Sequence, residues 1–175
     1  MFGRRRPTGL PRASTDAERR ALSDIEEYGW HCLLVADEHH PHHAEAIAAM
    51  GPHEVYDATF AYTVGVWGTW HHPELVLVGR WQHAHAYLSA LVAMIEEGAR
   101  FSPGDTTDEL LEGYEVRFGA VSDFRRTELL TWSDWANARR RFEAVQVILP
   151  DLAGKWPDED GYEGFPQPLL RPDAD

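Results

Sequence analysis

Five of the ten histidines of this 175-residue chain stand in one short segment, residues 37–54. Neutral imidazoles suit zinc, nickel and copper, and two histidines four positions apart on a helix can bind one ion. His39 and His43 have this spacing, and His42 lies between them. Pro41 separates the pair, however, and can begin a helix rather than continue one. The segment therefore predicts a divalent transition-metal site at His39, His42 and His43, with a solvated histidine-rich loop as the alternative.

A second group of residues with chemical potential follows Tyr62-Thr63-Val64-Gly65, where a β-branched and aromatic run ends in a loop rich in Trp and His. Loops held by a rigid sheet often carry function, and a histidine there can act as a general base or contact a ligand. The alternative is that His72 only hydrogen-bonds the backbone before Pro73. The predicted ligand-binding residues are Tyr62, Thr63, Gly65, Trp67, His72 and Arg117.

Six of the ten cations outside residues 1–20 are the arginines at 117, 125, 126 and 139–141, and they make an anionic ligand one option. Guanidinium groups suit phosphates and carboxylates, and Arg117 is the member of this set that we assign to the ligand site. The triplet at 139–141 has an alternative explanation, because cations are favoured at the C-terminus of a helix. The chain contains no GxGxxG, GxxxxGK[ST], GxSxG or CxxC motif, so no catalytic residue is predicted.

Charge and composition narrow the classes of partner. Residues 1–20 carry six Arg against two acids, a charge of +4, and the remainder carries 10 − 27 = −17. A body this acidic repels phosphate backbones, so we expect no nucleic acid as partner. No stretch approaches the length of a membrane span and the N-terminus lacks an apolar signal region, so we expect no membrane and a cytoplasmic location. The single cysteine, Cys32, excludes an intramolecular disulfide.

Hydrophobic periodicity gives the expected elements. Helices are predicted at 16–28, 81–97 and within 126–141, with a short one at 106–111; residues 67–73 are predicted as a loop. Strands are predicted at 30–36, 58–66, 74–78, 114–121 and 145–149. This order favours an α+β fold with a mixed, largely antiparallel five-stranded sheet, with closure into a barrel as an option, and two to three packed helices. The expected organisation is a disordered basic arm (1–14), one α+β domain (15–157) and an acidic Pro- and Gly-rich tail (158–175), where Asp158-Glu159-Asp160 is expected to be solvated.

Several motifs occur together in one order: IEEYGW at 25–30, FAYTVGVW at 60–67, HPELVLVG at 72–79, FSPGD at 101–105, LLEGYEVRF at 110–118, VQVILPD at 145–151 and a later Trp156-Pro157. Through them the chain resembles the bacterial family named domain of unknown function 4262, over about residues 22–157. The histidine-rich insert departs from that pattern, because the family usually needs only a short connection there.

The Tyr-Thr-Val-Gly strand is also similar to the strand of flavin-reductase-type split barrels that lays amides and a threonine hydroxyl against the flavin phosphate. That similarity implies a flavin or another phosphate-bearing ligand at the end of the 58–66 strand, which makes small-molecule binding the first expectation. A non-enzymatic protein-interaction module, such as an immunity or regulatory partner, is the alternative, together with metal binding by the insert. No oligomeric state is predicted.

Overall fold

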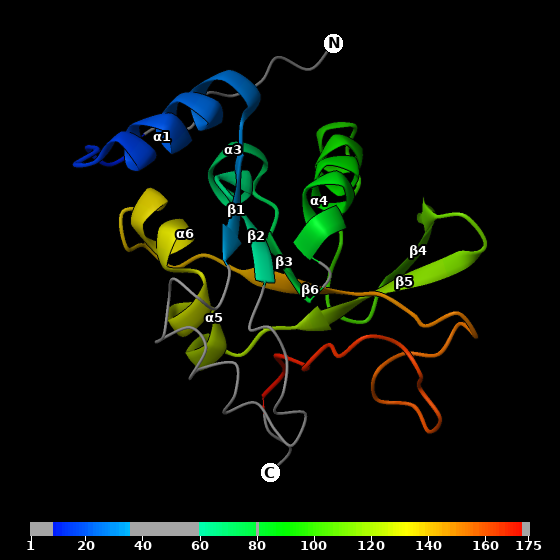
Figure 1. The fold of residues 1–175 in the computed structure, drawn as a ribbon. Helices are drawn as coiled ribbons and strands as arrows, with labels where there is room; N and C mark the ends of the chain where they lie inside the picture. Colours follow the sequence, from blue (N-terminus) through cyan, green and yellow to red (C-terminus); the bar gives the residue numbers. More distant parts are fainter. Residues whose placement is uncertain (1–8, 36–59, 80, 173–175) are drawn as a thin grey trace.

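The computed structural model describes residues 9–35, 60–79 and 81–172 of the chain (Figure 1). The histidine-rich insert, with the predicted metal ligands His39, His42 and His43, lies outside the described residues. The elements are α1 (Asp16–Tyr28), β1 (His31–Val35), β2 (Phe60–Val64), α3 (Val66–Trp70), β3 (Glu74–Val78), α4 (Trp81–Glu96), β4 (Thr106–Leu111), β5 (Tyr114–Ala120), α5 (Asp123–Leu129), α6 (Thr131–Ala136) and β6 (Ala144–Ile148).

The strands form one mixed sheet in the order β1-β2-β3-β6-β5-β4. Every neighbouring pair is antiparallel except β3 and β6, which run parallel. The α+β class and the largely antiparallel character are therefore confirmed. Among the described residues there are six strands rather than five, and the sheet stays open rather than closing into a barrel, since β1 and β4 lie at opposite edges.

The sixth strand is β4, where a short helix was predicted. Thr106 and Glu109 have the spacing of a helix-capping box, but the chain instead turns at Gly113 and pairs β4 with β5. Gly113 has φ +80°, a left-handed conformation that a side chain would oppose. The gain from pairing with β5 outweighs the local helical signal.

The helix count also differs from the predicted two to three, because the described residues hold five helices. The predicted loop at 67–73 begins with the short helix α3, and the helix predicted within 126–141 is two helices, α5 and α6. Leu130 separates these two helices with a non-helical backbone. The first helix and its ends are confirmed: Thr15 and Glu18 form the expected capping box, and Gly29 ends α1 in the left-handed conformation.

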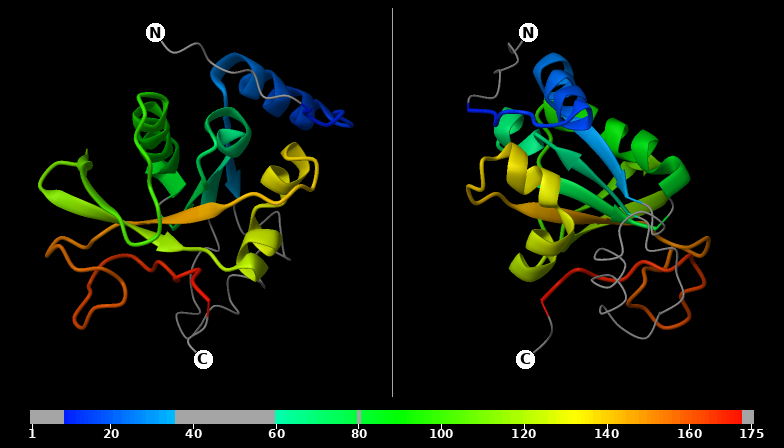
Figure 2. Two further views of the ribbon diagram at one scale, coloured as in Figure 1. Left: turned by 180° about the vertical axis from the view of Figure 1, so that it is seen from behind. Right: turned by 60° about the vertical axis from the view of Figure 1, so that its left-hand side comes forward.

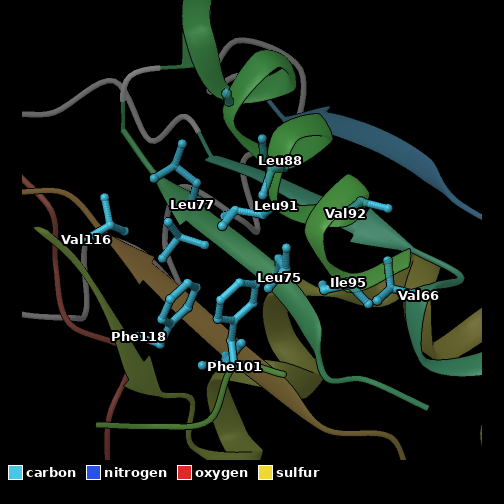
Figure 3. Packing of buried hydrophobic residues seen from close by; sticks show 14 of the residues in the cluster. Val66, Leu75, Leu77, Leu88, Leu91, Val92, Ile95, Phe101, Val116 and Phe118 are labelled. Atoms are coloured by element: carbon cyan, nitrogen blue, oxygen red, sulfur yellow. The ribbon is translucent and has the colours of Figure 1, made fainter. Parts of the chain in front are cut away.

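Helices cover both faces of the sheet (Figure 2). On one face α1, α5 and α6 pack on Tyr62, Val64 and Val76 through buried residues that include Ile25 and Leu129. On the other face α4 places a buried stripe against β1, β2 and β3, and residues of β5 and β6 complete this core (Figure 3). The labelled members of this second core are Val66, Leu75, Leu77, Leu88, Leu91, Val92, Ile95, Phe101, Val116 and Phe118.

Residues 156–172, called here the C-terminal segment, fold back on the sheet. The Gln146 side chain on β6 accepts from the Leu170 amide (2.8 Å) and donates to the Pro168 carbonyl (2.8 Å). Gln167 in turn bonds both the amide and the carbonyl of Leu149, at 2.9 and 2.7 Å. The C-terminal segment is thus held to β6 and to Leu149 by side-chain hydrogen bonds rather than by the backbone pairing of a further strand.

Truncation of Leu170 tests whether the C-terminal segment contributes to stability. Leu170 is fully buried in the core against Tyr62 and Leu129, so Leu170→Ala should lower the free energy of unfolding by about 2–5 kcal/mol. Leu152→Ala is the matched control, because Leu152 is 89% exposed and should change it by less than about 0.5 kcal/mol. Urea unfolding measures both values. Equal small effects would show that the segment lies on the core without stabilising it.

Candidate functional site

The most unusual side chain at the predicted site is Glu74, a carboxylate buried at the start of β3. Its two oxygens accept hydrogen bonds from the Thr63 hydroxyl (2.6 Å) and from the amides of Gly65 (3.0 Å), Val66 (3.3 Å) and Trp67 (3.1 Å). Buried charge is tolerated only where hydrogen bonds replace water, and these four donors supply that replacement. Glu74 thereby caps the otherwise unpaired amides that begin α3.

Gly65 makes this convergence of amides possible. Its φ of +105° turns the chain from β2 directly into α3, so that successive N–H groups point toward one place. A Cβ at this position would lie 3.0 Å from Ile25 Cγ1 and 3.3 Å from the Gly29 carbonyl oxygen. Both the backbone conformation and the close approach of α1 therefore require glycine.

Tyr62 and Thr63 extend the same network toward α6. The Thr63 hydroxyl accepts from the Leu75 amide at 2.9 Å, and the Thr63 carbonyl accepts from the Ser133 hydroxyl at 2.9 Å. The Tyr62 hydroxyl accepts from the Trp132 amide at 3.2 Å. Burial raises the pKa of Tyr62 above its usual range, so the phenol stays neutral. These contacts give both residues a role in holding β2, β3 and α6 together.

Burial raises the pKa of Glu74 from 4.5 to about 7, with its four hydrogen bonds acting in the opposite direction. The native state therefore holds this proton more tightly than the unfolded chain does. The resulting stabilisation is present in full below about pH 4.5 and is lost as the pH rises through 7. At its maximum it corresponds to about 3 kcal/mol.

A comparison with Glu74→Gln isolates this effect. Gln cannot titrate, so the stability advantage of the natural chain over the variant should shrink, by at most about 3 kcal/mol, as the pH rises from 4.5 to above 7. The variant should also be less stable by about 1–3 kcal/mol at every pH, because its amide nitrogen is only a donor whereas either oxygen of the Glu74 carboxyl group can accept a hydrogen bond. Guanidinium unfolding at a series of pH values measures both.

The stability of Glu74→Gln is subtracted from that of the natural chain at each pH to give a difference curve. This subtraction is needed because His72 titrates in the opposite sense. Burial lowers the pKa of His72, so its contribution is lost as the pH falls, and it cancels between the natural chain and Glu74→Gln. Glu128→Gln, an exposed change of the same kind on α5, is the control variant. A flat difference curve for Glu74→Gln would mean that Glu74 keeps the same proton affinity in both states.

His72 is fixed by two backbone groups. Its Nε2 accepts from the Phe101 amide at 2.9 Å, so Nδ1 carries the proton and donates to the Pro73 carbonyl at 2.7 Å. Both ring nitrogens are therefore occupied, as in the structural alternative stated for this residue. His71, its neighbour, is exposed and has φ +53°.

The structure brings together five of the six predicted ligand-binding residues and separates the sixth. Tyr62, Thr63, Gly65, Trp67 and His72 lie where β2 turns into α3 and β3 begins.

Arg117 lies on β5, three strands along the sheet from β2. Its guanidinium pairs with Asp158 at 2.5 Å and lies over the Trp156 ring at 4.9 Å. Asp158 also lies 3.4 Å from Arg171, so this carboxylate is paired rather than solvated as expected. Among the described residues, no group of three or more His, Cys, Asp or Glu side chains could hold a metal ion.

A hollow in the surface lies next to residues 67–73, the segment predicted as a loop. It has a volume of about 540 Å³ and opens between the end of α4 and the start of β4. Arg100 and Phe101 connect it to the loop, because Arg100 donates to the Trp70 carbonyl (3.3 Å) and Phe101 to His72. Its lining residues are Met94, Glu97, Ala99, Arg100, Phe101, Asp105, Thr106, Thr107 and Glu109.

This acidic hollow was not predicted, although the sequence carries a signal for it. Residues 96–115 contain seven acids against one cation, Arg100. These acids lie in the segment that links α4 to β5, apart from the histidine and arginine groups on which the predicted sites were based.

Comparison with family models gives a match to the family described as Domain of unknown function (DUF4262), over residues 24–163. No curated protein and no solved structure matches the chain. Among the described residues, no helix is long and apolar enough to cross a membrane.

Proposed function

Because the chain belongs to the DUF4262 family, whose description names no activity, we propose a function from the described residues alone. The protein is a protein-interaction module that holds cationic groups of another molecule in the acidic hollow between α4 and β4. The observation that supports this most directly is the set of three carboxylates, Glu97, Asp105 and Glu109, around one open volume of about 540 Å³.

The electrostatics of the hollow favour a cation over an anion. Arg100 is the single basic lining residue, and its guanidinium already donates to the carbonyls of Ala99 (2.8 Å) and Trp70 (3.3 Å). Glu97 and Glu109 are exposed, so their negative potential reaches solvent. With a formal net charge of −13 for the whole chain, long-range attraction also acts on cationic partners.

The form of the hollow favours side chains of a partner over an enclosed small ligand. Its volume falls within the range of about 300–1,000 Å³ common for ligand sites, but it is open to solvent and rimmed by exposed acids. Ammonium and guanidinium groups can enter such a site while remaining partly hydrated. A lysine- or arginine-bearing segment is therefore the chemistry that fits.

A phosphate-bearing ligand at the end of β2 has less support from the contacts. The Thr63 hydroxyl and the amides of Gly65 and Trp67, which such a ligand would need, donate to Glu74. An anion would have to displace this carboxylate from a fully buried position. Flavin binding stays a prediction that a visible spectrum and a flavin titration can test.

Metal binding by the insert also stays a prediction. Metal analysis of the natural chain and of a variant with His39, His42 and His43 replaced by Ala would test it. Equal metal content in the two proteins would count against the site.

The interaction proposal is tested by neutralising two lining acids. Glu97→Gln combined with Glu109→Gln should weaken the binding of a fluorescein-labelled lysine–glycine repeat peptide by about 2- to 30-fold, which is the effect of two exposed ion pairs at about 0.2–1 kcal/mol each. Fluorescence anisotropy titrations at low and high salt measure it. Added salt should reduce the difference, because exposed charges are screened.

The matched control is Glu128→Gln combined with Glu143→Gln. Both residues are exposed and lie outside the hollow, and the pair changes the net charge by the same amount. Its effect on peptide affinity should be small. Equal weakening by the two double variants would mean that the charge acts from the whole surface, which contradicts a site at the hollow.

A further inference from the structure

One wall of the acidic hollow is formed by residues of β4, the strand at one end of the sheet. β4 pairs with β5 on one side, and no described strand lies on its other side. The Phe118 amide donates to the Asp105 carbonyl at 2.9 Å, and Thr106 pairs opposite Arg117. Since successive residues of an antiparallel ladder alternate, the N–H and C=O of Thr106 point toward the open edge.

The same part of β4 lines the hollow. Thr106, Thr107 and Glu109 face Met94 and Glu97 of α4 across it. A register shift between Thr107 and Leu111 interrupts the pairing with β5, so regular strand geometry is confined to the beginning of β4. A segment added to this edge would therefore be short and would lie beside the hollow. Its side chains would alternate between the hollow and the opposite side.

Charge selects the occupant of this edge. Asp105, Asp108 and Glu109 all lie on or next to β4 and are exposed. A second copy of the chain pairing β4 with β4 would place these carboxylates close together, and charges of this kind usually protect edge strands from such pairing. An extended segment with lysine or arginine at alternate positions would instead place cations among Glu97, Asp105 and Glu109.

We propose that the partner is an extended basic segment of another protein, which adds as a short strand to β4 and places its cationic side chains in the hollow. This rests on the proposed function and adds the backbone as a second element of recognition. Strand addition supplies affinity through main-chain hydrogen bonds, and side-chain pockets supply specificity.

Backbone methylation separates the two claims. The probe is a fluorescein-labelled peptide of alternating lysine and valine, compared with the same peptide N-methylated at alternate backbone amides. Methylation keeps the charge but removes the donors that a strand needs, so the methylated peptide should bind about tenfold more weakly. Glu97→Gln with Glu109→Gln should weaken the binding of both peptides.

The outcomes of this experiment are distinct. Equal affinity of the two peptides, with a loss for both in the Glu97→Gln and Glu109→Gln variant, would overturn strand addition and leave the cation site in place. Equal affinity of both peptides for the natural chain and for this variant would overturn the proposed function as well. A concentration-dependent dimer of the free protein that blocks the peptide would identify a second copy as the occupant and overturn the basic segment.

A variant pair at Thr106 provides an independent measurement. Thr106→Pro removes the outward N–H and should reduce the affinity of the unmodified peptide to that of the methylated one. Thr106→Val retains the N–H while removing the hydroxyl that donates to Glu115 (3.2 Å), and it should bind as the natural chain does. In the natural chain, the peptide should also slow hydrogen exchange of the Thr106 amide. Unchanged exchange at saturation would contradict strand addition without depending on either variant.

Discussion

A carboxylate taken out of water determines how this fold is arranged around its central strands. Glu74 is fully buried, and it is stable there because β2 and α3 aim a hydroxyl and three amides at it. The turn at Gly65 is needed to aim them, and the start of β3 is needed to bring the carboxylate. His72 then ties the same region to Phe101, so the chain leaving α4 has a fixed direction toward β4. The hollow follows from that direction.

Local signals predicted the elements whose formation is local. The capping box at Thr15 and Glu18, the glycine after α1 and the apolar stripe of α4 gave helices at the observed places. The prediction of a helix at 106–111 was wrong. It relied on a capping-box spacing, which is a local signal, whereas the strand β4 forms through pairing with β5. The burial of Glu74 could not be predicted for the same kind of reason, since its donors come from residues 7 to 11 positions away.

Five of the six predicted ligand-binding residues lie where β2 turns into α3 and β3 begins, and their role in binding a ligand stays a prediction. Their hydrogen bonds are with Glu74 and with backbone groups rather than with one another. The polar groups of Thr63, Gly65 and His72 form hydrogen bonds within the protein, as buried polar groups usually do. Arg117 could not be placed from sequence, because its position depends on the order of the strands rather than on any motif.

The C-terminal segment has a consequence for how the chain folds as it is made. Gln146 lies on β6 and Leu149 directly follows it, and both have hydrogen-bond partners within residues 167–170. Leu170 belongs to the same buried core as Tyr62. During synthesis, about twenty further residues must therefore be made after β6 before these partners are available. Until then its polar side chains and the core face beneath Leu170 remain open to solvent and to other chains. Final closure of this face belongs to a late step of folding, after the central strands have been made.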